Sequence, residues 1–160
     1  MNEPKPRIIT VTGKRNSGKT TLVKNVYNYL VKQGAFILYY DVTGAHFEDI
    51  RAVVIWKGKV IALCSIGDYA DDDFKTDDTL WPLTYIKDGI DIAIKHKAEI
   101  LLNTYSSGNM TENDYKQLLK NKFGDEIFTP CLMTKNVYQT DCIKQNQEKL
   151  DFILNEIVNS

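Results

Sequence analysis

One short segment limits what this chain can fold into more than any other: Gly13-Lys14-Arg15-Asn16-Ser17-Gly18-Lys19-Thr20. We call it the glycine-rich loop. It follows a β-branched apolar run at residues 7–12, and it precedes apolar residues at helical spacing over residues 20–32. Its glycines permit a tight turn, and the four residues between them can curl so that successive backbone N–H groups point into one concavity. A strand, an anion-binding turn and a helix in this order predict an α/β fold.

Apolar patterning in the rest of the chain alternates between strands and helices. Short continuous runs predict buried strands at residues 7–12, 36–41 and 99–104, and a further strand is predicted at residues 127–133. Residues 51–56 and 60–66 predict a β-hairpin about Lys57-Gly58-Lys59. Helical spacing predicts helices at residues 20–32, 82–97, 111–123 and 141–158. The last helix is expected to bury Ile143, Leu150, Ile153, Leu154 and Ile157.

This order of elements predicts one α/β domain over residues 1–160, with a flexible tail at residues 1–6. The sheet is expected to be mostly parallel, with one antiparallel hairpin strand.

Charge and composition narrow the class of protein. The 160 residues include 20 Lys and Arg against 21 Asp and Glu, and this near-balance argues against a protein that coats nucleic acid or an anionic membrane. No apolar run approaches the ~20 residues that span a bilayer, and no signal peptide follows the charged start, so we expect a cytoplasmic protein. Cys64, Cys131 and Cys142 form no CxxC pattern and are expected to be buried, reduced thiols.

The glycine-rich loop matches the Walker A pattern G-x-x-x-x-G-K-[ST] in full. In this pattern Gly18 lets the backbone approach a phosphate, Lys19 places an ammonium near the β- and γ-phosphates, and Thr20 offers a hydroxyl to Mg²⁺. The predicted phosphate-binding residues are Gly13, Lys14, Arg15, Asn16, Ser17, Gly18, Lys19, Thr20 and Thr21.

With its flanking strand and helix, the segment resembles the P-loop NTPase superfamily, and in outline its stand-alone bacterial and phage members. The resemblance implies a three-layer sandwich, bound ATP or GTP, and Mg²⁺. Lys19 is the first catalytic candidate.

Lys14 is the second catalytic candidate, through a weaker resemblance. A lysine directly after the first glycine is similar to the deviant Walker A of the SIMIBI class, whose lysine reaches the phosphates of a partner subunit. That resemblance implies nucleotide-dependent homodimers. The chain departs from it at Arg15-Asn16, where the class usually carries two glycines. The interpretation of Lys14 as an ordinary solvated loop residue therefore stays open and is favoured.

A P-loop enzyme also needs an acidic residue near Mg²⁺, at the carboxyl end of a neighbouring strand. Asp68 follows the predicted hairpin and Asp41 follows residues 36–40, so both are candidate metal residues beside Thr20. The alternative for each is a strand-end aspartate that bonds its own turn. Ser65 is a candidate for holding a water near the phosphates.

The sequence predicts Mg²⁺-dependent binding of a nucleoside triphosphate with slow hydrolysis, used as a nucleotide switch. ATP is favoured over GTP, because Thr134 and Val137 stand where a guanine-reading Asn-Lys-x-Asp motif has Asn and Asp. A small-molecule kinase is an alternative, disfavoured because the chain has only three arginines to stabilise a transferred phosphoryl group. A nucleotide-responsive binding module without useful hydrolysis is the other alternative. His46 and His96 are expected at the surface or in packing, and the acidic run at residues 68–78 as a solvated loop or a lid.

Overall fold

The structure is a computed structural model that describes residues 5–14, 17–43, 49–66, 81–106 and 112–160. The strands are β1 (Arg7–Gly13), β2 (Phe36–Thr43), β3 (Asp49–Trp56), β4 (Lys59–Cys64), β5 (Ile100–Ser106) and β6 (Thr129–Met133). The helices are α1 (Lys19–Lys32), α2 (Trp81–Lys95), α3 (Glu112–Phe123) and α4 (Gln139–Val158). Each strand and helix expected from the sequence is present, with ends that move by a few positions. Over the described residues, no helix combines the length and the apolarity needed to cross a membrane.

The six strands form one sheet in the order β2-β3-β4-β5-β1-β6. Strand β3 runs antiparallel to both of its neighbours, whereas the β4–β5, β1–β5 and β1–β6 pairs are parallel. The predicted α/β fold, with a mostly parallel sheet and an antiparallel hairpin strand, is therefore confirmed. Because β3 is reversed, its amino end lies at the same edge of the sheet as the carboxyl ends of β1 and β4.

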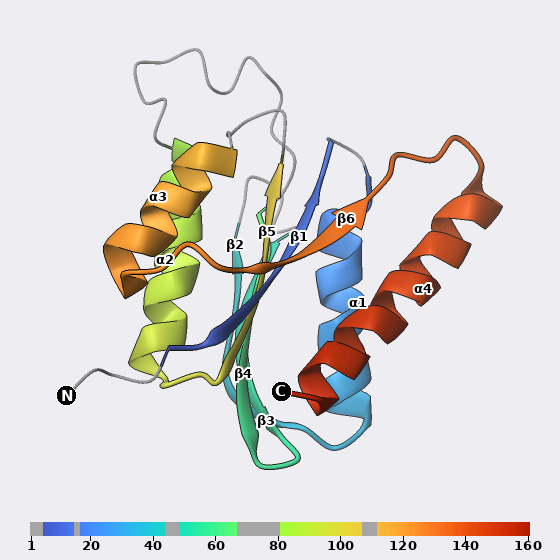
Figure 1. The fold of residues 1–160 in the computed structure, drawn as a ribbon. Helices are drawn as coiled ribbons and strands as arrows, with labels where there is room; N and C mark the ends of the chain where they lie inside the picture. Colours follow the sequence, from blue (N-terminus) through green and yellow to red (C-terminus); the bar gives the residue numbers. More distant parts are fainter. Residues whose placement is uncertain (1–4, 15–16, 44–48, 67–80, 107–111) are drawn as a thin grey trace.

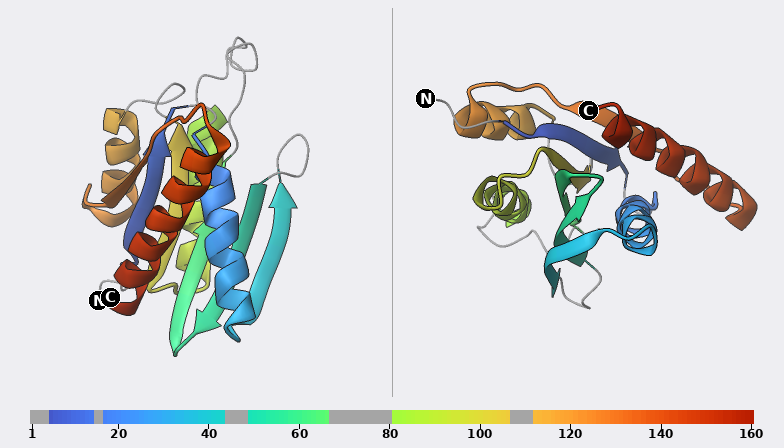
Figure 2. Two further views of the ribbon diagram at one scale, coloured as in Figure 1. Left: turned by 90° about the vertical axis from the view of Figure 1, so that its right-hand side faces the viewer. Right: turned by 90° about the horizontal axis from the view of Figure 1, so that it is seen from below.

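Helices cover both faces of the sheet (Figure 1). Helices α1 and α4 lie on one face and α2 and α3 on the other, which the view from below separates clearly (Figure 2). Each face buries its own apolar cluster. Side chains of α1 and α4, such as Leu22, Val26 and Ile153, pack in the first cluster, and Ile90 of α2 and Leu119 of α3 pack in the second.

Two expectations about burial are wrong. Strand β2 was expected to be buried, but it is the edge strand, and Phe36 is 67% exposed there because β2 pairs only with β3 among the described strands. Ile143 was expected in the core of α4, but it is 63% exposed, whereas Ile153 and Ile157 further along the helix are fully buried. Only the second half of α4 therefore packs on the sheet, and its first turns are available for other contacts.

Candidate functional site

Two glycines set the shape of the chain between β1 and α1. Gly13 ends β1 with φ of +156°, and a Cβ built on it would lie 2.5 Å from the Met133 carbonyl oxygen and 2.7 Å from Ser17 Oγ. Gly18 is the N-cap of α1 with φ of 91°, in the left-handed region. A side chain at position 13 would thus push β1 away from the end of β6 or displace Ser17. The glycine-rich loop requires a residue without a Cβ at this point.

Lys19 begins α1, and its side chain folds back over the loop. It is only 2% exposed. Its Nζ donates to the Lys14 carbonyl at 2.9 Å and to Ser17 Oγ at 3.5 Å. These oxygens compensate part of the cost of burying an ammonium and hold it at Lys14 and Ser17. The side chain of Lys14 is exposed, and Arg15 and Asn16 lie outside the described residues.

The start of α1 suits an anion. The first turn, which includes Thr20 and Thr21, carries no acidic residue, and the N-cap Gly18 offers no side chain to its N–H groups. The first N–H groups of a helix have no partner inside the helix, and the helix dipole places positive partial charge there. This helix start and the Lys19 ammonium therefore lie at the same loop.

The acidic residue beside Thr20 is Asp49, which the sequence analysis did not identify. Asp49 begins β3 and is 2% exposed. Its Oδ1 accepts hydrogen bonds from Thr20 Oγ1 at 3.3 Å and from Ser65 Oγ at 3.1 Å. The Ser65 hydroxyl in turn accepts from the Ile50 backbone N–H at 3.1 Å. Ser65 thus fixes the carboxylate of Asp49, and the carboxylate faces the hydroxyl expected to contact a metal.

The register of the antiparallel β3–β4 pair indicates Asp49. The predicted hairpin began at residue 51, which left Asp49 in a loop. Arg51 pairs with Cys64, so extending the antiparallel pair by two residues brings Asp49 opposite Ile66, next to Ser65. The missed signal was the continuation of a β-strand through residues 49 and 50.

The two aspartates expected to serve the metal are placed differently. Asp41 lies on the edge strand β2 and pairs with Arg51, whose guanidinium reaches Asp88 of α2. Directly paired residues share a face, so Asp41 points to the α2 face, opposite to the face that α1 covers. Its carboxylate accepts from the backbone N–H of Val42, the next residue of β2, at 2.9 Å. The structure therefore does not bring Asp41 to Thr20, and Asp68 lies outside the described residues.

The oxygen atoms at this edge of the sheet fit Mg²⁺. Mg²⁺ prefers hard oxygen ligands, and it commonly takes one or two side chains and completes its shell with water and phosphate. Thr20 and Asp49 supply a hydroxyl and a carboxylate. Over the described residues, no three His, Cys, Asp or Glu side chains gather into a metal site. The only histidine among them, His96, bonds the Ile92 carbonyl within α2.

Tyr115, Cys64 and Cys131 have raised pKa values and lie in the interior between the sheet and the helices. The pKa of Tyr27, which lies on α1 and is only partly buried, is also raised, first by burial and then by the neighbouring Tyr40. Burial raises the pKa of Tyr115 to about 12, against hydrogen bonds with Thr10 and Asn103 that lower it. Burial likewise raises the pKa of the Cys64 thiol to about 12 and that of Cys131 to about 11. Both thiols are buried and free, as expected, but Cys142 is exposed, which corrects the expectation for the third cysteine. The neutral forms of these groups are structural, because raised pKa values keep them protonated near pH 7.

Two cavities lie between α1 and α4. The first, which we call the N-end groove, has a volume of about 610 Å³ and adjoins the glycine-rich loop. It is lined by Ser17, Gly18, Thr21, Asn25, Asn28, Met133, Gln139, Cys142, Ile143, Gln145, Asn146, Gln147 and Leu150. None of these side chains is charged.

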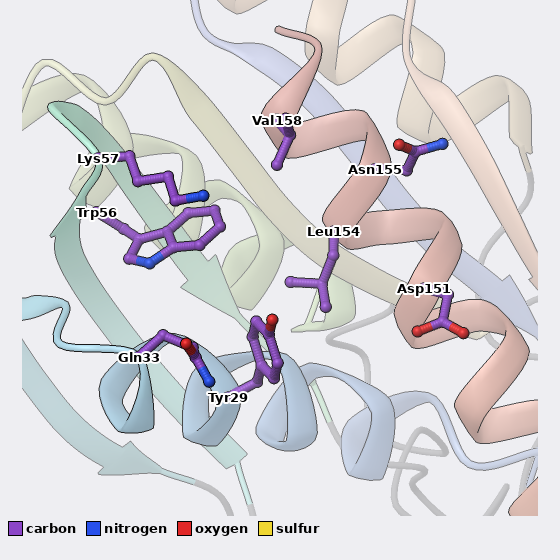
Figure 3. Close-up of a pocket in the computed structure, with 8 residues that line it drawn as sticks. All are labelled: Tyr29, Gln33, Trp56, Lys57, Asp151, Leu154, Asn155 and Val158. Atoms are coloured by element: carbon purple, nitrogen blue, oxygen red, sulfur yellow. The ribbon is translucent and has the colours of Figure 1, made fainter.

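The second, the C-end cavity, has about 500 Å³ and lies at the other end of the two helices (Figure 3). Its lining consists of Tyr29 of α1, the C-cap residue Gln33, Trp56 at the end of β3, Lys57 of the turn that follows, and Asp151, Leu154, Asn155 and Val158 of α4.

The glycine-rich loop, the start of α1, the Thr20–Asp49 pair and the N-end groove thus form one continuous candidate site. Its contacts come from β1, α1, β3, β6, α4 and the residue that follows β4. In comparisons with protein-family models, with curated proteins and with solved structures, nothing matched the chain.

Proposed function

We propose that this protein is a P-loop protein with a three-layer sandwich fold that binds a Mg²⁺–nucleoside triphosphate, ATP in preference to GTP, and hydrolyses it slowly. The observation that carries the proposal is the hydrogen bond between Thr20 and the buried carboxylate of Asp49. It places an acid beside the one hydroxyl that the Walker A pattern assigns to a metal. A glycine turn of structural use alone would not require a buried carboxylate at this point.

The chain's own groups would hold the triphosphate in three ways. Backbone N–H groups of the glycine-rich loop and the positive end of α1 would bind the phosphate oxygens. Lys19, whose ammonium already lies over the loop, would move from the Lys14 carbonyl toward the β- and γ-phosphates. Mg²⁺, when bound, would neutralise charge on the β- and γ-phosphate oxygens. Thr20 and Asp49 would hold it, and Ser65 would keep the carboxylate of Asp49 in place.

Slow turnover is part of the proposal. We assign no general base among the described residues, and the two positions where the chain could supply further charge, Lys14 and Arg15, belong to the loop itself. Phosphoryl transfer to water is slow when a site positions the phosphates and stabilises their charge but places no general base beside the attacking water. A switch that changes partners or its oligomeric state on nucleotide binding is the biological role that fits such a rate. Lys14 of a second copy would contribute if the dimer forms.

The test measures how Mg²⁺ changes ATP affinity. Asp49→Asn keeps the size of the side chain and an oxygen that can accept from Thr20 and Ser65, but it removes the charge. We expect calorimetry to show that Asp49→Asn loses about tenfold in Mg²⁺–ATP affinity and keeps the affinity for ATP measured in excess chelator. Asp41→Asn is the matched control, and it should leave both affinities unchanged.

Several outcomes would contradict the proposal. Absence of binding heat with both ATP and GTP would remove it altogether, and an unchanged Mg²⁺ dependence in Asp49→Asn would remove the metal assignment. Phosphate release without any acceptor separates slow hydrolysis from the kinase alternative, because a strict kinase releases little. A single turnover with excess protein that bound nucleotide but formed no product would point to the binding module instead. Sedimentation with and without ATP tests the dimer.

A further inference from the structure

The N-end groove continues directly from the glycine-rich loop, since Ser17 and Gly18 belong to both. We infer that the groove takes the adenosine part of ATP and that its carboxamide lining selects adenine over guanine. The inference rests on the proposed function, because the loop has to hold the phosphates for the groove to receive a nucleoside. It adds the place where the base binds and the residues that read it.

The dimensions of the groove suit a nucleoside. Along α1 the groove is lined by Thr21, Asn25 and Asn28, which are spaced by four and three residues and so lie on one face of the helix. From Thr21 to Asn28 the helix rises by roughly 10 Å, about the length of a nucleoside extending from its phosphates. The volume of about 610 Å³ lies within the range of small-molecule sites. A ligand held at the loop would therefore reach the middle of the groove.

Hydrogen bonds within the chain keep the walls of the groove in place. Asn25 Nδ2 of α1 donates to Asn146 Oδ1 of α4, which ties the two helices together. Gln145 pairs with the backbone of Thr134, donating to its carbonyl and accepting from its N–H, both at 2.8 Å. This pairing holds the segment between β6 and α4 against the helix. The groove is thus built before any ligand binds.

Two side-chain carboxamides on opposite walls of the groove are available to bind a ligand. Asn28 on α1 and Gln139 at the start of α4 line the groove, and no hydrogen bond joins either side chain to another residue that the structure describes. A carboxamide offers one acceptor beside one donor, which matches the amino group and ring nitrogen of adenine in a bidentate pair. Guanine presents an additional amino donor, which a carboxylate would best accept, and the described residues that line the groove include no carboxylate.

Apolar side chains supply the surface for the face of the base. Met133 forms part of the floor and is 3% exposed, with its Cε near Gly18. Ile143 stands on the α4 wall and is 63% exposed, although it is large and apolar. A base in the groove would cover Ile143, which gives a physical reason for its otherwise unfavourable position.

The experiment compares three ligands, each with Mg²⁺: ATP, GTP and inorganic tripolyphosphate. Ile143→Trp fills the groove from an exposed position, so it leaves the core intact. Lys144→Trp adds the same ring at the next position of α4, outside the groove, and is the matched control. In the unchanged protein we expect ATP to bind about tenfold tighter than GTP or tripolyphosphate. Ile143→Trp should lower ATP affinity to the level of tripolyphosphate, with tripolyphosphate affinity unchanged, and Lys144→Trp should change neither.

The outcomes separate this inference from the proposed function. If ATP and tripolyphosphate bind the unchanged protein equally, or if Ile143→Trp keeps the full preference for ATP, the loop binds phosphates but the groove does not hold the base. Equal binding of ATP and GTP would overturn the adenine assignment. If none of the three ligands binds, the proposed function fails, and this inference fails with it. Loss of tripolyphosphate binding in Ile143→Trp would also count against the inference, since the groove would then act through the loop.

Discussion

Helices α1 and α4 run in the same direction, with two cavities between them. The cavities differ in how far the polar groups around them are hydrogen-bonded within the chain itself. Both helices begin at the N-end groove and end at the C-end cavity (Figure 1). The lining of the N-end groove is uncharged, whereas Lys57 and Asp151 line the C-end cavity (Figure 3). Helix polarity adds a second difference, because N–H groups are left over at the start of each helix and carbonyl groups at its end.

At the C-end the leftover carbonyl groups are bonded by the chain itself. Lys59 Nζ donates to the carbonyls of Ile157, Val158 and Ser160 at 2.9, 3.2 and 2.7 Å. Lys32 lies in the last turn of α1, where a cation is favourable. The start of α1 has no acidic residue in its first turn. The comparison teaches that the fold itself bonds the carbonyl end of α4. The first turn of α4 carries Asp141, whereas the first turn of α1, where we propose that the phosphates bind, has no acidic side chain.

Lys19→Ala should give the largest effect and test the N-end directly. Removing the ammonium over the loop should weaken binding of Mg²⁺–ATP by about a hundredfold or more, since a charge-assisted contact to phosphate is lost in a largely buried position. Calorimetry measures the affinity, and thermal unfolding checks that the variant is folded. Lys24→Ala, on the same helix but outside the groove, is the control. Affinity within twofold of the unchanged protein in Lys19→Ala would break the comparison.

Gly13→Ala and Gly34→Ala compare the two ends of α1 by a matched substitution. A Cβ at Gly13 meets the Met133 carbonyl oxygen at 2.5 Å, whereas nothing lies within 4 Å of a Cβ at Gly34, which has φ of +91°. We expect Gly13→Ala to lower the free energy of unfolding by about 3 kcal/mol and to weaken nucleotide binding. Gly34→Ala should cost about 1 kcal/mol, from its left-handed backbone alone. Equal losses in urea unfolding would show that the close approach at Gly13 is unimportant.

Lys59→Met should separate stability from binding. The substitution keeps an unbranched side chain but removes the donor to three carbonyls at the end of α4, so we expect a loss of about 1–2 kcal/mol in the free energy of unfolding. ATP affinity should stay within twofold, because the change lies at the far end of the helices. Urea unfolding and calorimetry on the same preparation measure both. A fall in affinity that matched the fall in stability would contradict the independence of the two ends.

Lys57→Met should give the smallest effect. The ammonium of the exposed Lys57 lies 4.7 Å from the centroid of the buried Trp56 ring, which is a cation–π contact. Its loss should cost about 0.5 kcal/mol, and it should leave ATP binding unchanged. Thermal unfolding at low and high salt detects the electrostatic part. A large effect on binding would show that the C-end cavity has a role that its contacts do not indicate.

Much of the fold could be predicted from the sequence, because the local spacing of apolar residues indicates where strands and helices form. The strands and helices lie where the spacing of apolar residues and the turn residues predict them. The antiparallel hairpin strand was expected from Lys57-Gly58-Lys59. Burial was harder to predict. Phe36 and Ile143 are apolar residues in apolar patterns, yet both are exposed. Which strand lies at the edge, and where a helix leaves the sheet, depends on pairings between distant segments.

The candidate site likewise has one part that adjacent residues in the sequence specify and another part that depends on residues distant in the sequence. Residues 13–20 specify their turn by themselves, because two glycines, a lysine and a threonine at fixed spacing need only the adjoining strand and helix. Asp49 is the partner of Thr20 only because β3 is antiparallel to its neighbours. Its amino end therefore lies at the same edge of the sheet as the carboxyl ends of β1 and β4. The N-end groove likewise exists only because α4 packs along α1. Strand order and helix packing arise from long-range burial, which no local spacing encodes, and they alone decided which side chains surround the loop.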